Sequence, residues 1–213
     1  MSEPTNDWAQ DAEAGVLDAA LKLAPALGWG QALVEAAARD AGLSKGEALL
    51  LLPVGARDLA ALLSQRHDRA ALTALANVDP KALKVRERIA RGAQARLDAA
   101  FADELALRRW AGFLSLPPNV PLALRLVWKS ADVIWRWAGD TATDENHYSK
   151  RAILSGVLTS TLAVRLSGGP EAARAHLKSR IDAVMVFETW KAKVKPLEVA
   201  QDLARFFGKG ARI

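Results

Sequence analysis

The sequence predicts an all-α fold. Apolar residues recur at the i, i+3 and i+4 spacing of an amphipathic helix along almost every segment. The alternation of β-branched residues that indicates strands is nearly absent. Glycine and proline stand between the periodic segments, where they end one helix and allow the next to begin. The chain is therefore expected to be a series of helices joined by short turns.

The expected helices follow from these breaks in chain order. The breaks lie at Gly28–Gly30, Gly42, Pro53–Gly55, Pro117–Pro121, Gly168–Pro170 and Pro196. Pro121 suits the first position of a helix, where its missing N–H would have no partner. We expect helices near residues 10–27, 31–41, 44–52, 56–76, 80–114, 120–138, 144–167, 171–194 and 197–207.

Length and composition indicate how the chain is organised. With 213 residues, 51% of them apolar, it can form one large domain or a small head and a larger body. We expect a head over residues 1–55, a helical body over 56–195 and a tail over 196–213. The chain has no cysteine, which excludes disulfides and thiolate metal sites. No apolar run approaches the ~18–20 residues that span a bilayer.

The first residues, MSEPTNDWAQDAEAG, are acidic and have neither the basic nor the apolar stretch of a targeting signal. We therefore expect neither a secretory signal nor a mitochondrial transit peptide. The predicted location is the cytoplasm of a bacterium, with peripheral association to the inner membrane.

The head contains a motif that is typical of DNA-binding proteins. Residues 41–46, AGLSKG, followed by Pro53, resemble the turn into the recognition helix of the tetracycline-repressor family. This resemblance implies that family's helical fold, with a three-helix head and a ligand-binding and dimerisation body. The family normally has a Tyr, a basic residue or His, and a Phe where this chain has Leu49, Leu50 and Leu52.

The charge of the head argues against DNA binding. Residues 11–60 carry four bases against seven acids, a net charge of −3, although the whole chain is formally +5. Affinity for DNA depends on basic residues that neutralise phosphates. We therefore expect that DNA is not a partner. The alternative is a ligand-responsive repressor, which retention on heparin with a steep salt dependence would favour.

The most distinctive stretch is residues 136–151, RWAGDTATDENHYSKR, between a Trp-rich helix and a strongly periodic one. Thr143 is a suitable N-cap, and Asp144 and Glu145 would lie in the first turn of the second helix, where acidic groups complement the helix dipole. The run AGDTATDENHYSKRAILSGV resembles the signature of the coenzyme Q (ubiquinone) biosynthesis accessory lipid-binding family. It departs from that signature at His147, where the family commonly has an aromatic residue, often Trp.

This resemblance implies a function. A member of that family would be a non-enzymatic protein that binds an isoprenoid or quinone intermediate and presents it to a hydroxylase of the ubiquinone pathway at the membrane. The start of the second helix would contact the hydroxylase. Asp144, His147, Tyr148 and Arg151 have the i, i+3, i+4 and i+7 spacing of one helix face, so one partner could touch all four. The alternative is that these residues cap and pack the turn.

Metal binding and catalysis are not expected. Asp144 and His147 have the spacing of half of a di-iron site, but the chain has no Glu-x-x-His motif to supply the other half. The sequence also lacks the GxSxG, HExxH, P-loop and GxGxxG motifs of common enzyme classes. We therefore expect neither an enzyme nor a cofactor.

The Trp-rich helix is the predicted lipid site. Trp128 and Trp135 are seven residues apart and so share one helix face. Rigid tryptophans separated by alanines pack loosely enough to leave a cavity, although Trp at helical spacing is often only part of a core. The predicted lipid-binding residues are Trp128, Ile134, Trp135, Trp137 and Leu158.

Two further expectations concern association. Helices 144–167 and 171–194 resemble the antiparallel pair through which the repressor fold dimerises, so we expect a homodimer. The tail has an apolar face flanked by lysines, which is typical of a helix that lies on a membrane surface. The alternative is that this helix packs on the body. The predicted membrane residues are Leu197, Leu203, Phe206, Phe207 and Lys209.

Overall fold

The structure is a computed structural model that describes residues 7–141 and 145–193, with residues 7, 145, 146 and 185–193 described by backbone alone. Every regular element in this part of the chain is a helix, which confirms the predicted all-α class. The predicted cap Thr143 and the five predicted membrane residues of the tail lie outside the described residues. The elements are α1 (Asp7–Leu27), α2 (Gln31–Asp40), α3 (Lys45–Leu51), α4 (Ala56–Ala74), the 3₁₀ turn η1 (Pro80–Ala82), α5 (Val85–Ala100), η2 (Phe101–Asp103), α6 (Glu104–Ser115), η3 (Pro117–Asn119), α7 (Val120–Trp137) and α8 (Glu145–Lys193).

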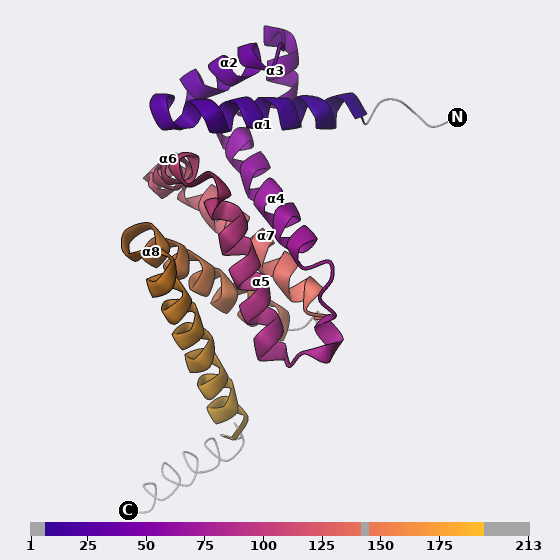
Figure 1. Cartoon of the computed structure of the whole chain (residues 1–213), viewed down its shortest axis with the longest axis vertical. Coiled ribbons are helices and arrows are strands. Elements are labelled where there is room, and N and C mark those ends of the chain that lie inside the picture. The colour runs from indigo at the N-terminus through magenta and orange to yellow at the C-terminus, as the bar shows by residue number, and fades with distance from the viewer. Residues whose placement is uncertain (1–6, 142–144, 194–213) are drawn as a thin grey trace, which may run out of the picture.

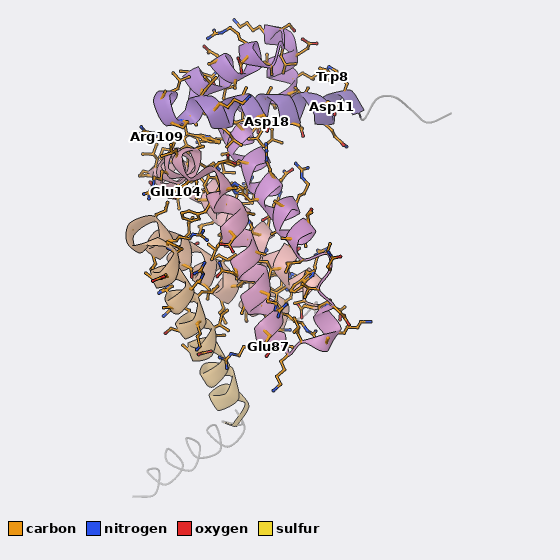
Figure 2. All side chains as sticks on the ribbon, in the orientation of Figure 1. Trp8, Asp11, Asp18, Glu87, Glu104 and Arg109 are labelled. Carbon is orange, nitrogen blue, oxygen red and sulfur yellow. The ribbon has the colours of Figure 1, made fainter. Side chains whose placement is uncertain are left out.

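The N-terminal helices lie across one end of an elongated bundle. In Figure 1, α1 runs across the end of α4, with α2 and α3 above it and α6 below it, and α4, α5 and α7 continue downward. Arg109 of α6 donates two hydrogen bonds to the carbonyl of Pro25 in α1. Arg66 of α4 pairs with Asp18 of α1. Figure 2 labels Asp18 on α1 and Arg109 on α6.

The short helix α3 is exposed on its apolar side. Its start is closed by a capping box in which Ser44 and Glu47 exchange hydrogen bonds. None of its residues is buried, and Leu49 and Leu50 face solvent. A helix of this composition offers one base, Lys45, to a DNA backbone. The expectation that this head does not bind DNA stays a prediction.

Two clusters of buried side chains hold the helices together. The larger one joins α1, α2, α4, α6 and α7, and the smaller one joins α5, α7 and α8. Because the larger cluster runs from Val16 to Leu126, the core is continuous across residue 55, where the sequence suggests a boundary between head and body. The proposed division into head, body and tail stays a prediction.

One predicted helix is broken in two. The periodicity over residues 80–114 predicts a single helix, but the structure has α5 and α6 with η2 between them. The break contains no glycine or proline. The cause is packing: α5 buries Leu97 in the smaller core, whereas α6 buries Trp110 in the larger one. The interruption at η2 allows α5 and α6 to pack in different places, so tertiary contacts override local propensity.

The last described helix bends where glycine and proline predict a break. Gly169 has a φ of 81°, which favours glycine, and Pro170 follows it inside α8. The two arms of α8 meet at this bend (Figure 1).

By length and composition alone, His147–Val184 is apolar enough to cross a membrane, which the sequence analysis did not expect. Leu154, Val157 and Leu177 of this segment are buried in the smaller core.

Gly92 allows close packing of α5 on α7. A Cβ atom at this position would lie 2.6 Å from Cγ2 of Ile134. Gly92→Ala is therefore expected to lower the free energy of unfolding by about 1–3 kcal/mol, because overpacking outweighs the better helix propensity of alanine. Gly112 in α6 has no such neighbour within 4 Å, so Gly112→Ala should raise stability by about 0.5–1 kcal/mol. Urea unfolding of both variants measures this, and equal stabilisation by the two changes would contradict it.

Candidate functional site

The candidate site is built around the turn that joins α7 to α8. Gly139 adopts a φ of 87° immediately after α7. Its N–H donates to the carbonyl of Arg136 at 3.0 Å, and the N–H of Asp140 donates to the carbonyl of Trp135 at 3.0 Å. This pair of bonds is the Schellman arrangement that ends a helix at a left-handed glycine. The chain therefore reverses sharply, and Asp140 faces the first turns of α8.

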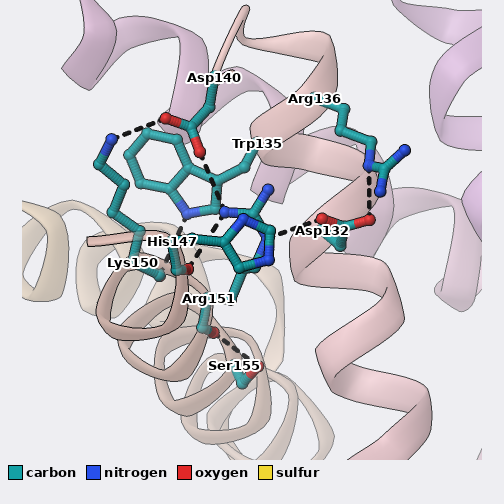
Figure 3. A network of polar contacts seen from close by, with 8 residues as sticks. All are labelled: Asp132, Trp135, Arg136, Asp140, His147, Lys150, Arg151 and Ser155. Atoms are coloured by element: carbon teal, nitrogen blue, oxygen red, sulfur yellow. Dashed lines mark hydrogen bonds and ion pairs between the residues drawn. The ribbon is translucent and has the colours of Figure 1, made fainter. Parts of the chain in front are cut away.

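Arg151 fills the space between the two helices (Figure 3). It is 1% exposed. Its Nε donates to Oδ1 of Asp132 at 2.6 Å and its Nη1 to Oδ2 of Asp140 at 3.0 Å, with a further bond to the carbonyl of His147 at 3.1 Å. Three parts of the chain are thus tied to one guanidinium, whose planar set of donors suits several oxygen partners at once.

Two more cations complete the network. Lys150 Nζ pairs with Oδ1 of Asp140 at 2.7 Å, and Arg136 Nε pairs with Oδ2 of Asp132 at 2.7 Å. Burial raises the pKa of Asp140, but the hydrogen bonds from Lys150 and Arg151 outweigh it and hold that pKa below its ordinary value. Asp140 is therefore ionised at neutral pH and binds Lys150 and Arg151 as a carboxylate.

The predicted partner-binding face is divided by this network. Arg151 points into the protein, so the expectation that it shares an exposed face with Tyr148 is wrong. Helical spacing shows that side chains share a direction but not whether that direction faces solvent, and here Asp132 and Asp140 draw Arg151 inward. Tyr148 is exposed and lies 6.3 Å from Trp128 between ring centroids, His147 is half-buried, and Asp144 lies outside the described residues.

A cavity of about 330 Å³ opens beside the turn, between α5, α7 and α8. We call it the Trp135 cavity. Apolar side chains form most of its wall, including Trp135, Ile89, Ile153 and Val157. Its volume lies at the lower end of the range for ligand pockets, about 300–1,000 Å³. An apolar group of moderate size therefore fits here.

The rim of the Trp135 cavity is polar and joined to the Arg151 network. Lys150 and Asp140 line it together with Arg88. The indole N–H of Trp135 donates to the carbonyl of Lys150 at 3.1 Å, and the ammonium of Lys150 lies 5.2 Å from the centre of the Trp135 ring. Arg88 donates to the carbonyl of Ala138 at 2.8 Å, so it fastens α5 to the same turn.

The structure separates the other predicted lipid-binding residues. Leu158 lines a second cavity and Trp128 borders a hollow on the surface beside His147. Ile134 is buried against Gly92 in the smaller core, and Trp137 packs against that core. Lipid binding by any of them stays a prediction.

Sequence reasoning missed Asp132, Lys150 and Arg88, which arrange this site. Asp132 stands one turn after Trp128 and four residues before Arg136, and the second spacing predicts an i, i+4 ion pair. Nothing in this spacing indicates that Asp132 also binds a buried arginine from the helix beyond the turn. Arg88 comes from a helix distant in sequence, and its partner is a backbone carbonyl. A contact of that kind leaves no pattern in the side chains.

The depressed pKa of Asp140 predicts a pH-dependent contribution to stability. An acid whose pKa is lower in the folded state than in the unfolded state stabilises the folded protein. This contribution is complete above the pKa of the unfolded state and is lost as the pH falls through the pKa of the folded state. Asp140→Asn should lower the free energy of unfolding at neutral pH by about 1–3 kcal/mol, since two charged partners lose an ionised acceptor. The difference between wild type and variant should shrink only below about pH 4, where ordinary Asp groups titrate. Urea unfolding across this range measures it, and a difference independent of pH would refute it.

Comparison with known proteins identifies the region that carries this site. Residues 120–188, which span α7 and most of α8, match the COQ9 family model. The chain is 27% identical over 185 residues to the mitochondrial ubiquinone biosynthesis protein COQ9 of Xenopus tropicalis, covering 82% of this chain and 58% of that protein. It is 29% identical over 159 residues to the mitochondrial COQ9 of Homo sapiens, covering 71% of this chain and 49% of that protein.

The predicted family resemblance is therefore confirmed. The chain spans about half of the length of the curated relatives it matches. The prediction of a cytoplasmic protein associated with a bacterial inner membrane is wrong, since the curated relatives are mitochondrial proteins. That prediction relied on the acidic charge of the first residues. The charge of a short segment indicates a compartment only when that segment is itself a targeting signal.

Proposed function

Since residues 120–188 match the COQ9 family model, we propose that this protein is a non-enzymatic accessory protein of ubiquinone biosynthesis. It would bind an isoprenoid or quinone intermediate and present it to a hydroxylase of the pathway at a membrane surface. The observation that carries the proposal is the Trp135 cavity, an apolar space that the matched region lines together with α5.

The walls and the rim of the Trp135 cavity support a lipid ligand. Isoprene units are branched, uncharged and rigid at their double bonds, so they suit walls made of Trp135, Ile153 and Val157. The polar rim supplies Lys150 and Arg88 next to the apolar wall. A ligand with an apolar tail and an oxygen-bearing ring would bury the first and leave the second at the rim, where the amine and guanidinium donate hydrogen bonds.

The surface next to the cavity supports a protein partner. Tyr148 is 64% exposed, although a tyrosine ring is largely apolar, and its ring lies 5.2 Å from that of His147. Aromatic side chains that stand out of a surface are common at the centres of protein interfaces. The next two residues, Ser149 and Lys150, line the cavity, so a partner bound to Tyr148 would be close to a bound lipid. Homodimerisation stays a prediction.

The lipid part of the proposal is tested by filling the cavity. Ile153→Trp would place a bulky indole ring in the Trp135 cavity. Ala152→Trp adds the same ring at the neighbouring position, which is exposed. Each full chain is purified, extracted with organic solvent and examined by mass spectrometry for isoprenoid quinones and their precursors. Wild type and Ala152→Trp should carry lipid, and Ile153→Trp should have lost it while keeping its helical circular dichroism. Equal lipid in all three would overturn the assignment of this cavity.

The partner part is tested separately with Tyr148→Ala. This change should weaken binding to the pathway hydroxylase in a pull-down titration while leaving the melting temperature nearly unchanged, because the side chain is exposed. Leu105→Ala, at a similarly exposed position of α6, is the matched control and should bind like wild type. If both variants bind normally, the surface around Tyr148 is not the contact.

A further inference from the structure

A groove of about 380 Å³ runs over the surface between α5 and the second arm of α8, which follows the bend at Gly169. We call it the Arg91 groove. One wall comes from α5 and the other from the second arm of α8. Figure 2 labels Glu87, which lines the groove near the start of α5. The groove adjoins the Trp135 cavity, since Arg86 and Ile181 line both.

The floor of the Arg91 groove is apolar. Leu177 and Ile181 stand one helical turn apart on α8, and both are buried in the smaller core. Ala90 of α5 packs against the same core and is half-buried. A hydrocarbon chain that lay along this floor would therefore meet apolar atoms rather than polar groups.

The rim of the Arg91 groove is basic. Arg91 stands on α5, Arg174 and Lys178 stand on the second arm of α8, and all three are exposed. Among the described side chains, none of the three has an ion-pair or hydrogen-bond partner. Arg174 and Lys178 have the i, i+4 spacing at which like charges on a helix repel and destabilise it. Three cations thus surround one groove with no counter-charge from the described part of the chain.

Two acids line the same groove but have other partners. Asp182 pairs with Arg86, so this ion pair joins α8 to α5. Glu87 accepts a hydrogen bond from the N–H of Lys84 at 3.1 Å and so caps the start of α5. With four bases against two acids, the lining residues carry a net charge of +2. That charge favours an anionic ligand.

A phosphate group suits the three cations at the rim. Arginine donates two parallel N–H groups to phosphate oxygens, and lysine binds phosphate as a point charge. Inorganic phosphate would use this rim but leave the apolar floor exposed to water. An anionic phospholipid fits both parts of the groove, because it joins a phosphate to hydrocarbon chains.

We propose that the Arg91 groove is a headgroup site for an anionic phospholipid. The phosphate binds Arg91, Arg174 and Lys178 at the rim, and the first methylene groups of the acyl chains lie against Leu177 and Ile181 on the floor. The inference depends on the charge and the floor of this groove and not on the proposed function. It therefore does not require that the Trp135 cavity hold a lipid, or that the tail contact a membrane.

The test measures binding of dihexanoyl phosphatidate, used as a monomeric lipid, to the full chain by isothermal titration calorimetry. Replacing both Arg174 and Lys178 with glutamine should weaken binding about thirtyfold, from about fivefold for each base. Replacing both Arg125 and Arg180 with glutamine is the matched control. It removes the same charge from exposed positions outside the groove and should change the affinity by less than about threefold, because salt screens distant charges. Equal affinities of the wild type and the groove variant would overturn the proposal.

Three further comparisons identify the ligand and its position. Dihexanoyl phosphatidylcholine, which has the same chains but no net charge, should bind at least about tenfold more weakly than phosphatidate. Inorganic phosphate should also bind more weakly because it has no chains, and an affinity equal to that of phosphatidate would overturn the assignment of a lipid. Ile153→Trp, which fills the Trp135 cavity, should leave phosphatidate binding unchanged. Loss of binding in Ile153→Trp, with retention in the variant that lacks Arg174 and Lys178, would place the lipid in that cavity and refute the proposal.

Discussion

Replacing Arg151 with methionine is expected to lower the free energy of unfolding by about 3–5 kcal/mol. Methionine matches the length of the apolar part of the side chain, so the change removes charge and hydrogen bonds more than volume. It leaves Asp140, whose side chain is 7% exposed, and Asp132, 23% exposed, without their shared interior cation. Two carboxylates that face a position formerly occupied by a guanidinium also repel each other.

Arg136→Met is the matched control for this change. Arg136 pairs with the same Asp132, but its side chain is 72% exposed, so the pair is screened by water and should contribute less than about 1 kcal/mol. Urea unfolding of both variants at neutral pH gives the two values. A small loss for Arg151→Met, comparable to that for Arg136→Met, would show that the buried network adds nothing beyond a surface ion pair.

Stability is also expected to fall steeply as the pH drops below about 6.5, because of His67. Burial, with smaller contributions from Arg96 and Arg66, lowers the pKa of this side chain from 6.5 to about 3. The side chain is 3% exposed, and neither ring nitrogen has a hydrogen-bond partner among the described residues. Its ring meets that of Trp110 edge to face, with centroids 6.1 Å apart. The folded protein therefore keeps His67 neutral.

The sign of the effect follows from proton uptake. Between about pH 3 and 6.5 the unfolded chain protonates this histidine and the folded chain does not, so acid favours unfolding. The stability that comes from keeping His67 neutral is complete above pH 6.5, its pKa in the unfolded chain. It is lost as the pH falls toward about 3, its pKa in the folded protein. The full loss is on the order of 4–5 kcal/mol, at about 1.4 kcal/mol per pH unit.

His67→Leu tests this expectation directly. The variant should lose this part of the pH dependence and should be at least as stable as wild type at pH 5, because leucine needs no hydrogen bonds in a buried position. His176→Gln is the control, since His176 is half-buried and hydrogen-bonded to Ser160, and it should retain the wild-type dependence. Guanidinium unfolding between pH 7 and 4 decides the matter. An unchanged slope in His67→Leu would assign the acid sensitivity to carboxyl groups instead.

The fold was predictable wherever the chain carries local signals. The prolines before α7 and the sequence Gly168-Gly169-Pro170 each act through their own backbone geometry, and both predicted breaks are confirmed, the second as a bend within α8. The break at Phe101–Asp103 was not predictable, because it depends on how α5 and α6 pack against helices that are distant in the sequence. Periodicity describes one helix at a time and holds no information about the positions of two cores.

The candidate site shows the same division. The motif around Gly139 correctly indicates a turn, and Trp135 does line a cavity. The direction of Arg151 could not be read from its spacing, because two oppositely facing sides of a helix have the same period. Two aspartates on the preceding helix and turn decide that direction, and their approach exists only after the chain reverses at Gly139.

The Arg151 network also bears on the order in which the chain can fold. Its contacts join residues 19, 11 and 4 positions apart. The hydrogen bonds of the buried Arg96 to Asp68, Ser64 and Ser130 join residues 28, 32 and 34 positions apart. Loop-closure entropy rises with the number of residues enclosed, so the α7–turn–α8 hairpin has the lower entropic barrier of the two. Contact order is correspondingly low in this region. The unit that holds the family signature is therefore suited to assemble early, as a local nucleus on which α4 and α5 later dock.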